Sequence, residues 1–261
     1  MRSFQDLHSP ANIKKFADFL FCSGDYLRSI DEYKKYLQSS EDDTVEFKIG
    51  LALSGMKKFS EAADYFAQTK KNSSLYLQNE IEYEKALLQA GDFNLLRSRY
   101  DKTAKSTELK RLNYLSYFYG NDFPVMDEFL FAFPAGNRDQ IKKLYKWKSN
   151  PPIKSEITAV ILSVLIPGAG KFYIEEYGDG IAAFVATALF GYLSYDNFKA
   201  DHKFRGWLFA GISAFFYAGN IYGSAAGVPI YNAKLYFDFY NNLDAYLDKQ
   251  NYFLPEYGFC K

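Results

Sequence analysis

The chain has 261 residues, and its 31 Lys and Arg residues balance 31 Asp and Glu residues, so the formal net charge is zero. Nucleic-acid-binding proteins normally carry a basic excess, and the balance therefore argues against that class. Apolar residues make up 48% of the chain, which is enough to bury a core and excludes general disorder.

The charges are divided unevenly along the chain. Residues 1–155 contain 24 basic and 21 acidic residues, whereas residues 156–261 contain 7 and 10. Three charge-free runs lie in the second half, at 157–170, 180–195 and 206–233. A helix needs about 20 residues to cross a hydrocarbon core of about 30 Å. We therefore predict a polar first half and a membrane-embedded second half, although each run taken alone also fits a buried core helix.

A short turn followed by an aromatic residue recurs in the first half. It begins at Gly24, Lys57 and Gly91, at intervals of 33 and 34 residues. Amphipathic helical stretches flank these turns, at 13–21 and 27–37, at 45–53 and 60–67, and at 80–88 and 94–100. Period and anchor residues resemble tetratricopeptide repeats over roughly residues 10–110. The third unit departs from the pattern, because Glu84 and Leu96 replace small residues.

The resemblance implies an all-α solenoid that binds a protein or peptide on its concave face. A divergent fourth hairpin at 112–133, with its turn at 120–124, would cap the stack, so the repeat domain is predicted to cover 1–135. First helices of the pairs line the concave face of such arrays. The matching positions here are Lys14, Asp18, Phe21, Phe47, Ile81 and Lys85. Asp18 stands where the carboxylate-clamp subtype has Asn, which argues against capture of chaperone C-termini. The alternative is that these positions are only solvated or packed.

A basic linker at 136–155 precedes the predicted membrane module at 156–233. Residues 166–173 read Ile-Pro-Gly-Ala-Gly-Lys-Phe-Tyr and invite comparison with a phosphate-binding loop. That loop needs a glycine where Leu165 stands and a hydroxyl where Phe172 stands, so nucleotide binding is rejected. Pro167 and Gly168 are instead expected to end or kink the first apolar helix.

The third charge-free run carries glycines at four-residue spacing, namely Gly219, Gly223 and Gly227. Such a ladder of small residues lets another helix approach closely. The approaching helix is either the face of the second run that contains Ala182 and Ala186 or the same run in a second copy of the chain. The second alternative predicts a homo-oligomer.

Two groups of residues in this half resemble a bacterial membrane module over roughly 156–235. The first group is Pro167, Gly168, Gly170 and Tyr173, and the second is Gly219, Asn220, Tyr222 and Gly223. They match the patterns L-P-G-x-G-[QK]-x-Y and G-N-[IV]-Y-G, and they are distantly similar to two-helix domains with the signature G-x-F-G-x-H-R-F-Y. The resemblance implies a bacterial inner-membrane location, contact with lipid and no assigned activity.

Orientation follows from the number of crossings. Three crossings would place the repeats in the cytoplasm by the positive-inside rule. With a re-entrant first run, two crossings remain, the repeats lie outside the cytoplasm, and the basic loop 196–205 lies inside. The resemblance favours the second alternative, because the repeats of such proteins generally follow a secretory leader. The first eight residues lack the apolar region of a leader, which predicts either cytosolic repeats or a leader already removed.

Segment 234–261 is predicted as an amphipathic C-terminal helix and tail. After Pro229, residues 231–249 alternate apolar residues such as Phe239 and Leu243 with acidic and amide residues. An acidic polar face is poorly attracted to anionic lipid, and docking onto the repeat domain is therefore the favoured use.

No catalytic site, metal site or cofactor is predicted. His8 and His202 are the two histidines, and neither belongs to a catalytic constellation. The spacing of Cys22 and Cys260 suggests neither a metal site nor a disulfide framework. The leading hypothesis is a membrane-anchored scaffold that recruits a protein partner, used in envelope biogenesis or secretion. One alternative is a membrane module that itself handles a substrate or lipid at 167–173 and 220–223, with the repeats as regulator. Another is a fully soluble all-α protein.

Overall fold

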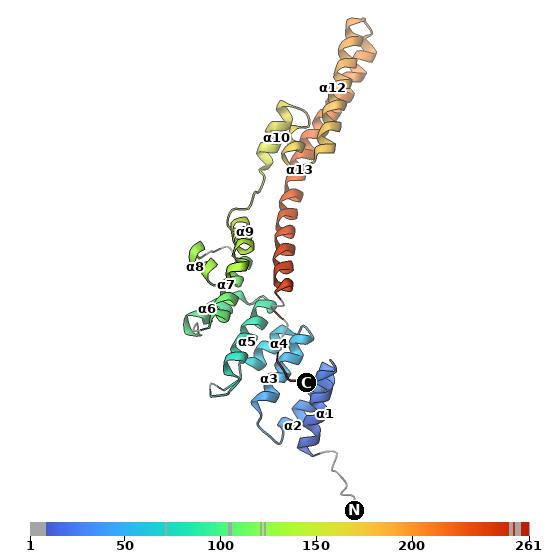
Figure 1. Ribbon diagram of the computed structural model, residues 1–261. Coiled ribbons are helices and arrows are strands. Elements are labelled where there is room, and N and C mark those ends of the chain that lie inside the picture. Colours follow the sequence, from blue (N-terminus) through green and yellow to red (C-terminus); the bar gives the residue numbers. More distant parts are fainter. Residues whose placement is uncertain are drawn as a thin grey trace, which may run out of the picture. The chain divides into compact units, whose positions relative to one another are not determined.

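The computed structural model describes residues 9–70, 72–103, 106–120, 122, 124–250, 253 and 257–260, the side chains of residues 100–103 excepted (Figure 1). Every element in these ranges is helical, which confirms the all-α prediction. The chain forms two compact units. We call residues 1–145 with 247–261 the array unit, and residues 146–246 the hairpin unit.

The array unit is built from a succession of short helices. Its elements are α1 Pro10–Cys22, α2 Tyr26–Leu37, α3 Asp43–Gly55, α4 Phe59–Phe66, α5 Tyr76–Ala90, α6 Phe93–Thr103, α7 Thr107–Ser116, the 3-10 turn η1 Tyr117–Tyr119, α8 Met126–Phe131, the 3-10 turn η2 Ala135–Asn137, and most of α9 Arg138–Ser149. The three predicted helix pairs are therefore present as α1–α2, α3–α4 and α5–α6.

Local chemistry sets the ends of these helices. The Asp42 side chain accepts hydrogen bonds from the Thr44 and Val45 amides and so caps α3. Gly91 ends α5 in the left-handed conformation, with φ of +81°, which glycine adopts without steric cost. Gly91 begins one of the turns predicted from the repeat period, whereas Asp42 lies between the first and second predicted helix pairs.

From α1 to α7, each helix of the array packs against the next. Contacts join α1 to α2, α2 to α3, α3 to α4 and α4 to α5, and α7 contacts both α5 and α6. Small residues allow the close approaches. Ala17 is fully buried, and a side chain at Gly50 would collide with the Phe66 ring. The stack thus shares a continuous core along its length, as expected for a repeat array.

The end of the array differs in detail from its prediction. The fourth pair comprises α7, η1 and α8, and α7 begins at Thr107, ahead of the expected residue 112. Residues 121 and 123 of the predicted turn lie outside the described residues, as does His8. The segment expected as a basic linker contains α9, which forms because Ile141 and Leu144 bury an apolar face.

The hairpin unit consists of α10 Glu156–Leu165, α11 Ala169–Tyr173, α12 Tyr177–Lys199 and most of α13 Lys203–Lys249. In Figure 1, α12 runs beside α13 as a helical hairpin. The Ser213 hydroxyl donates to the Thr187 carbonyl across this pair, and the Ser194 hydroxyl donates to the Gly206 carbonyl. The α10 helix ends at Leu165, directly before Ile166 and Pro167, as the proline predicted.

The α13 helix runs without interruption for 47 residues and contains Pro229. The amphipathic segment expected after Pro229 is therefore the continuation of α13 and not a separate helix. Proline removes one backbone donor from the helix, and buried contacts of Val228 before it and Phe239 after it hold both parts in place. The predicted apolar face is confirmed, because Phe239 and Leu243 are 1% and 0% exposed.

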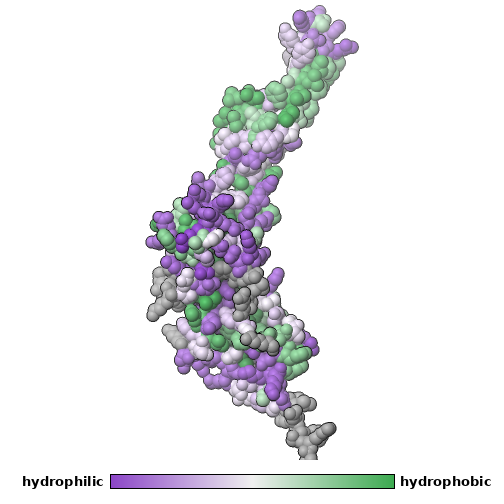
Figure 2. Space-filling view, in the orientation of Figure 1, coloured by the Kyte–Doolittle hydropathy of each residue, from purple (hydrophilic) through white to green (hydrophobic). Residues whose placement is uncertain are grey.

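Many apolar side chains of the hairpin unit are exposed. Examples are Ile157 at 73%, Leu165 at 72% and Phe215 at 75%. Figure 2 shows apolar surface over α10 and the adjoining parts of α12 and α13, ending at a polar tip. Within the described ranges, none of the helices meets the length and hydropathy expected of a membrane-spanning helix.

Candidate functional sites

The predicted concave face comprises the side chains of α1, α3 and α5, which are the first helices of successive pairs. Lys14, Asp18 and Phe21 lie on α1, Phe47 on α3, and Ile81 and Lys85 on α5. Most of these residues make specific contacts. Asp18 accepts hydrogen bonds from the Lys48 ammonium at 2.6 Å and from the Tyr33 hydroxyl at 2.7 Å. The face is therefore a paired polar network built around an aromatic centre.

The network continues at both of its ends. The Lys14 ammonium lies 2.5 Å from the Asp42 carboxylate, and the Lys85 ammonium lies 2.7 Å from Glu82. Burial alone would raise the pKa of Asp42, but Lys14 and the backbone N–H groups of Thr44 and Val45 hold that pKa below its ordinary value. The same hydrogen bond raises the pKa of Lys14. The Lys14–Asp42 pair thus links α1 to the start of α3.

The C-terminal residues 257–260, which we call the strap, lie on this face. The Tyr257 ring meets the Phe47 ring edge-on, with 5.0 Å between centroids, and the Phe259 ring lies 6.2 Å from Phe47. The Lys48 ammonium sits 4.9 Å from the centre of the Phe259 ring. Phe47 is thereby 1% exposed. The sequence placed Phe47 on a binding surface, and the structure covers that position with the chain's own tail.

Tyr257 has a polar partner as well as an aromatic one. Its hydroxyl donates to Glu82 at 3.1 Å, and Glu82 is also the partner of Lys85. Burial raises the pKa of the Tyr257 phenol, and the Glu82 carboxylate raises it further. The hydroxyl therefore remains a hydrogen-bond donor throughout the physiological pH range.

A disulfide joins the strap to the array, between Cys22 at the end of α1 and Cys260. The spacing of these two cysteines along the chain gave no sign of this bond. A separation of 238 residues carries no local signal, and only the fold brings the two Cα atoms to 5.4 Å. An even number of cysteines was the available hint. Both residues are exposed to solvent.

An open pocket of about 350 Å³ lies on the same face of the array. Phe21 of α1 and Leu51 of α3 line it on the apolar side, and Glu82 and Lys85 supply polar groups. Phe253, which belongs to the segment before the strap, also lines it. The strap thus leaves part of the predicted binding face uncovered.

The motif residues of the hairpin unit meet where α10 ends. Gly168 adopts a φ of +91°, and its amide donates to the Asn220 side-chain oxygen of α13 at 3.1 Å. A side chain at Gly168 would collide with the Gly180 carbonyl, and one at Gly170 with the Ala159 carbonyl. Asn220 thus satisfies an amide that the break in the helix leaves unpaired. The two parts of the motif are in direct contact, although Gly168 and Asn220 are 52 residues apart in the sequence.

Hydroxyl groups extend this contact. The Ser163 hydroxyl donates to Ser224 at 2.7 Å and accepts the Gly170 amide at 3.2 Å. Both serines are fully buried, and neither was predicted as a site residue. Their positions in the sequence could have indicated this contact, because Ser163 lies on α10 and Ser224 is one helical turn from Asn220.

Three other predicted motif residues have different roles. The Tyr173 hydroxyl accepts the Ser155 amide at 3.2 Å, and the Tyr173 ring lies 4.7 Å from the Lys154 ammonium. Tyr222 is 77% exposed. Gly219 is also exposed, with open space where a side chain would begin.

The glycine ladder divides between two environments. A side chain at Gly227 would collide with Ile174, and one at Gly223 would press on the Lys171 side chain. Lys171 is in turn 2.5 Å from Glu176. Gly223 and Gly227 therefore allow the close approach of α11 and the turn after it. Gly219, alone of the three, faces open space.

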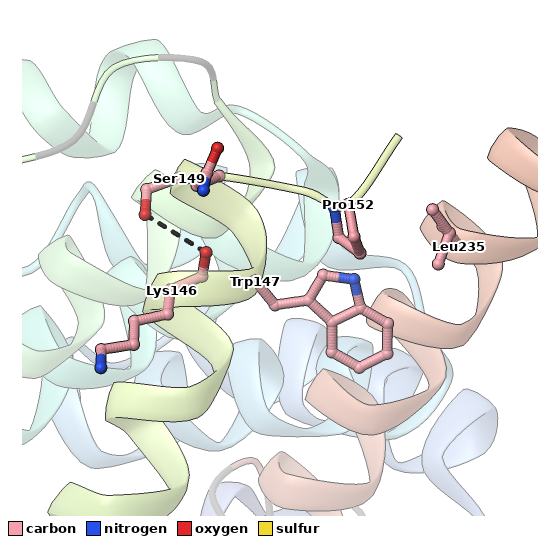
Figure 3. Close-up of a pocket in the computed structure, with 6 residues that line it drawn as sticks. Lys146, Trp147, Ser149, Pro152 and Leu235 are labelled. Atoms are coloured by element: carbon pink, nitrogen blue, oxygen red, sulfur yellow. Dashed lines mark hydrogen bonds between the residues drawn. The ribbon is translucent and has the colours of Figure 1, made fainter. Parts of the chain in front are cut away.

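A shallow pocket of about 490 Å³ lies near the start of the hairpin unit, lined by Lys146, Trp147, Ser149, Asn150, Pro152 and Leu235. In Figure 3 the Trp147 indole faces Pro152, and the Ser149 hydroxyl points toward the Lys146 carbonyl. The aliphatic and aromatic lining offers contact area without a set of convergent polar groups.

Among the residues that the structure describes, no group of three or more His, Cys, Asp or Glu side chains is placed to hold a metal ion. The face of the array carries aromatic rings and paired polar groups. No known protein family, no curated protein and no solved structure matches this chain.

Proposed function

We propose that this protein is a scaffold that binds a short peptide segment of a protein partner on the inner face of its helical array. One observation carries the proposal: the face already holds a peptide segment, residues 257–260 of its own chain, through Phe47, Lys48 and Glu82. Arrays of stacked helical pairs offer such continuous faces for recognition.

We further propose that the hairpin unit anchors the scaffold at the bacterial inner membrane. Exposed apolar side chains such as Leu165 and Phe215 support this proposal, because contiguous apolar surface favours contact with lipid or protein. After the helix break at Ile166 and Pro167, the Gly168 amide is paired with Asn220 and the Gly170 amide with Ser163. Non-helical backbone at membrane depth needs such partners.

The lengths of the helices support the re-entrant alternative. The α10 helix has ten residues, which span about 15 Å, or half of a hydrocarbon core. Two crossings, by α12 and the first part of α13, would leave the array outside the cytoplasm. The disulfide between Cys22 and Cys260 supports the same side, because such bonds persist in oxidising compartments.

A flotation experiment tests the anchoring. The full chain, expressed in a bacterial host, is expected to float with membranes after an alkaline carbonate wash. Replacement of Val185, Leu189 and Phe215, which are exposed in the hairpin unit, by Gln is expected to release it. Replacement of the exposed Phe19 and Leu27 of the array by Gln is the matched control and should leave flotation unchanged. Recovery of the unchanged chain in the aqueous fraction would refute the anchoring.

Photocrosslinking tests the binding. A photoreactive residue at Gln89, which lines the open pocket, is expected to crosslink one discrete partner in intact cells. The same residue at Glu61, which lies on α4 and does not line the pocket, is the control. Equal labelling from both positions would show random collision and contradict recognition at the face.

The second candidate function is handling of a lipid or small substrate at the motif of the hairpin unit. The side-chain nitrogen of Asn220 favours it, because that atom is buried and has no hydrogen-bond partner. Replacing Asn220 and Gly168 discriminates the two functions. If the cell loses the function of the protein while flotation and crosslinking persist, the motif itself acts. If the cellular function, flotation and crosslinking all persist, the scaffold proposal stands.

A further inference from the structure

The strap makes the contacts expected of a bound ligand. Its two aromatic rings pack on Phe47, one of them carries a hydroxyl held by Glu82, and the other lies beneath the Lys48 ammonium. Phe47 and Lys48 belong to α3, and Glu82 belongs to α5. The array therefore contacts one short segment through residues of two successive helix pairs.

The geometry of the segment defines what is recognised. The Phe259 amide donates to the Tyr257 carbonyl at 2.7 Å, which folds the backbone into a tight turn around Gly258. The turn brings the two rings to 5.9 Å from one another on the side that faces Phe47. The recognised element is thus a tyrosine, a small residue and a second aromatic residue.

We propose that the strap is a built-in competitor of the partner and that the Cys22–Cys260 disulfide locks it in place. This inference rests on the proposed function and specifies its ligand, a Tyr-Gly-Phe-like turn of the partner, and its control, the redox state of one disulfide. While the bond is intact, the strap cannot leave Phe47 because a covalent bond holds its end to α1. The open pocket lined by Phe21 and Phe253 gives the partner a first contact beside it.

Opening the lock is a thiol–disulfide exchange with a dithiol oxidoreductase or a small dithiol. One thiolate of the dithiol attacks a sulfur of the Cys22–Cys260 bond and forms a mixed disulfide, and the freed cysteine takes up a proton. The second thiolate of the dithiol then releases the other cysteine. Two electrons pass from the dithiol to the protein, the dithiol becomes a disulfide, and Cys22 and Cys260 end as thiols. Both cysteines are exposed, so the reductant can reach them.

Reduction alone leaves the strap attached to the chain through α13. A tethered ligand competes at an effective concentration on the order of millimolar, which a moderately tight partner must still overcome. Full access to the face is therefore expected only when the strap's two rings are also removed.

The test measures binding of a fluorescent peptide with the sequence of residues 253–261 and Ser in place of Cys260, by anisotropy, to the full chain in detergent. The strap-free variant carries Cys22→Ser, Cys260→Ser, Tyr257→Ala and Phe259→Ala. We expect it to bind the peptide roughly tenfold or more tightly than the oxidised unchanged chain, with the reduced chain between them. Thiol titration verifies reduction, and the reduced arm needs no substitution that could impair folding.

Peptide variants complete the experiment and leave the protein unchanged. A peptide with Tyr257→Phe loses the hydroxyl that donates a hydrogen bond to Glu82 and is expected to bind several-fold more weakly. A peptide with both aromatics changed to Ala is the negative control. Equal affinity of the oxidised chain and the strap-free variant would overturn the lock while leaving peptide recognition intact. Absence of binding to the reduced chain and to a strap-free variant with unchanged circular dichroism would overturn recognition of the Tyr-Gly-Phe turn, whereas crosslinking from Gln89 judges the proposed function separately.

Discussion

The array unit and the hairpin unit solve the packing of helices in two different ways. In the array, large rings interlock, as where the Phe47 and Phe66 ring centroids lie 5.7 Å apart, and the buried Lys48 ammonium is paired with the Asp18 carboxylate. In the hairpin unit, backbones approach at glycines, and hydroxyl and amide groups such as Ser163 and Asn220 bond across the gap.

Under the membrane anchoring that we propose, the difference follows from what surrounds each unit. Burial of large apolar side chains drives association when the alternative is water. Where the surroundings are themselves apolar, close backbone packing and hydrogen bonds between helices must supply the association. The exposed apolar faces of the hairpin unit are consistent with the second regime. Substitutions that act on one mode of packing should therefore affect one unit only.

The largest effect is expected from Phe47→Ala in the array. Phe47 is 1% exposed, and removal of a buried phenylalanine ring costs about 3–5 kcal/mol through lost contacts and the cavity left behind. Hydrogen exchange during denaturation should show the loss in α3 and α4, and no change in α12. Phe19→Ala, at a site 67% exposed, is the control and should change stability by less than about 0.5 kcal/mol. An equal loss in both units would contradict the division.

An intermediate effect is expected from Gly170→Ala in the hairpin unit. The new methyl group would collide with the Ala159 carbonyl and the Ser163 hydroxyl, and such overpacking costs about 1–3 kcal/mol. Both tryptophans of the chain, Trp147 and Trp207, lie in the hairpin unit, so their fluorescence follows its unfolding. Gly211→Ala, with open space around it, is the matched control. If the hairpin unit of Gly170→Ala unfolds at the same denaturant concentration as the unchanged unit, close backbone approach does not explain the packing of the hairpin unit.

The smallest effect is expected from Asp42→Asn, which keeps a cap for α3 and removes the charge that Lys14 pairs with. The folded-state pKa of Asp42 lies below its ordinary value, so the stabilisation is present above the unfolded pKa and is lost as pH falls through the folded one. We expect the substitution to cost roughly 1 kcal/mol at pH 7 and nothing at pH values below the folded pKa. Denaturant titrations at the two pH values measure it, and a cost independent of pH would rule out the ion pair as its source.

Local patterns predicted most of the helices and several of their ends. The period of 33 and 34 residues located three helix pairs, because turn residues and apolar faces are properties of short stretches. Pro167 and Gly168 predicted the end of α10 for the same reason. The motif at 167–170 was also linked to Asn220 by resemblance, and the structure supplies the hydrogen bond that joins them.

Other features depend on contacts that short stretches do not encode. The amphipathic segment after Pro229 was predicted as a C-terminal helix, yet it is the continuation of α13, which runs through the proline with buried residues on both sides. Phe47 was predicted on the binding face and is covered by Tyr257 and Phe259. Neither outcome follows from helical periodicity, because each depends on which distant segment supplies the neighbouring surface.

The sequence by itself therefore determined the helical units, the position of most turns and the contrast between a charged array and an apolar hairpin. Tertiary structure alone decided that the strap occupies the array and that Cys22 bonds Cys260. The physical reason is range: periodicity reports hydrogen bonds and side chains within about one or two helical turns. Cys22 and Cys260 are 238 residues apart, so no local pattern reports their contact and only the folded chain brings them together.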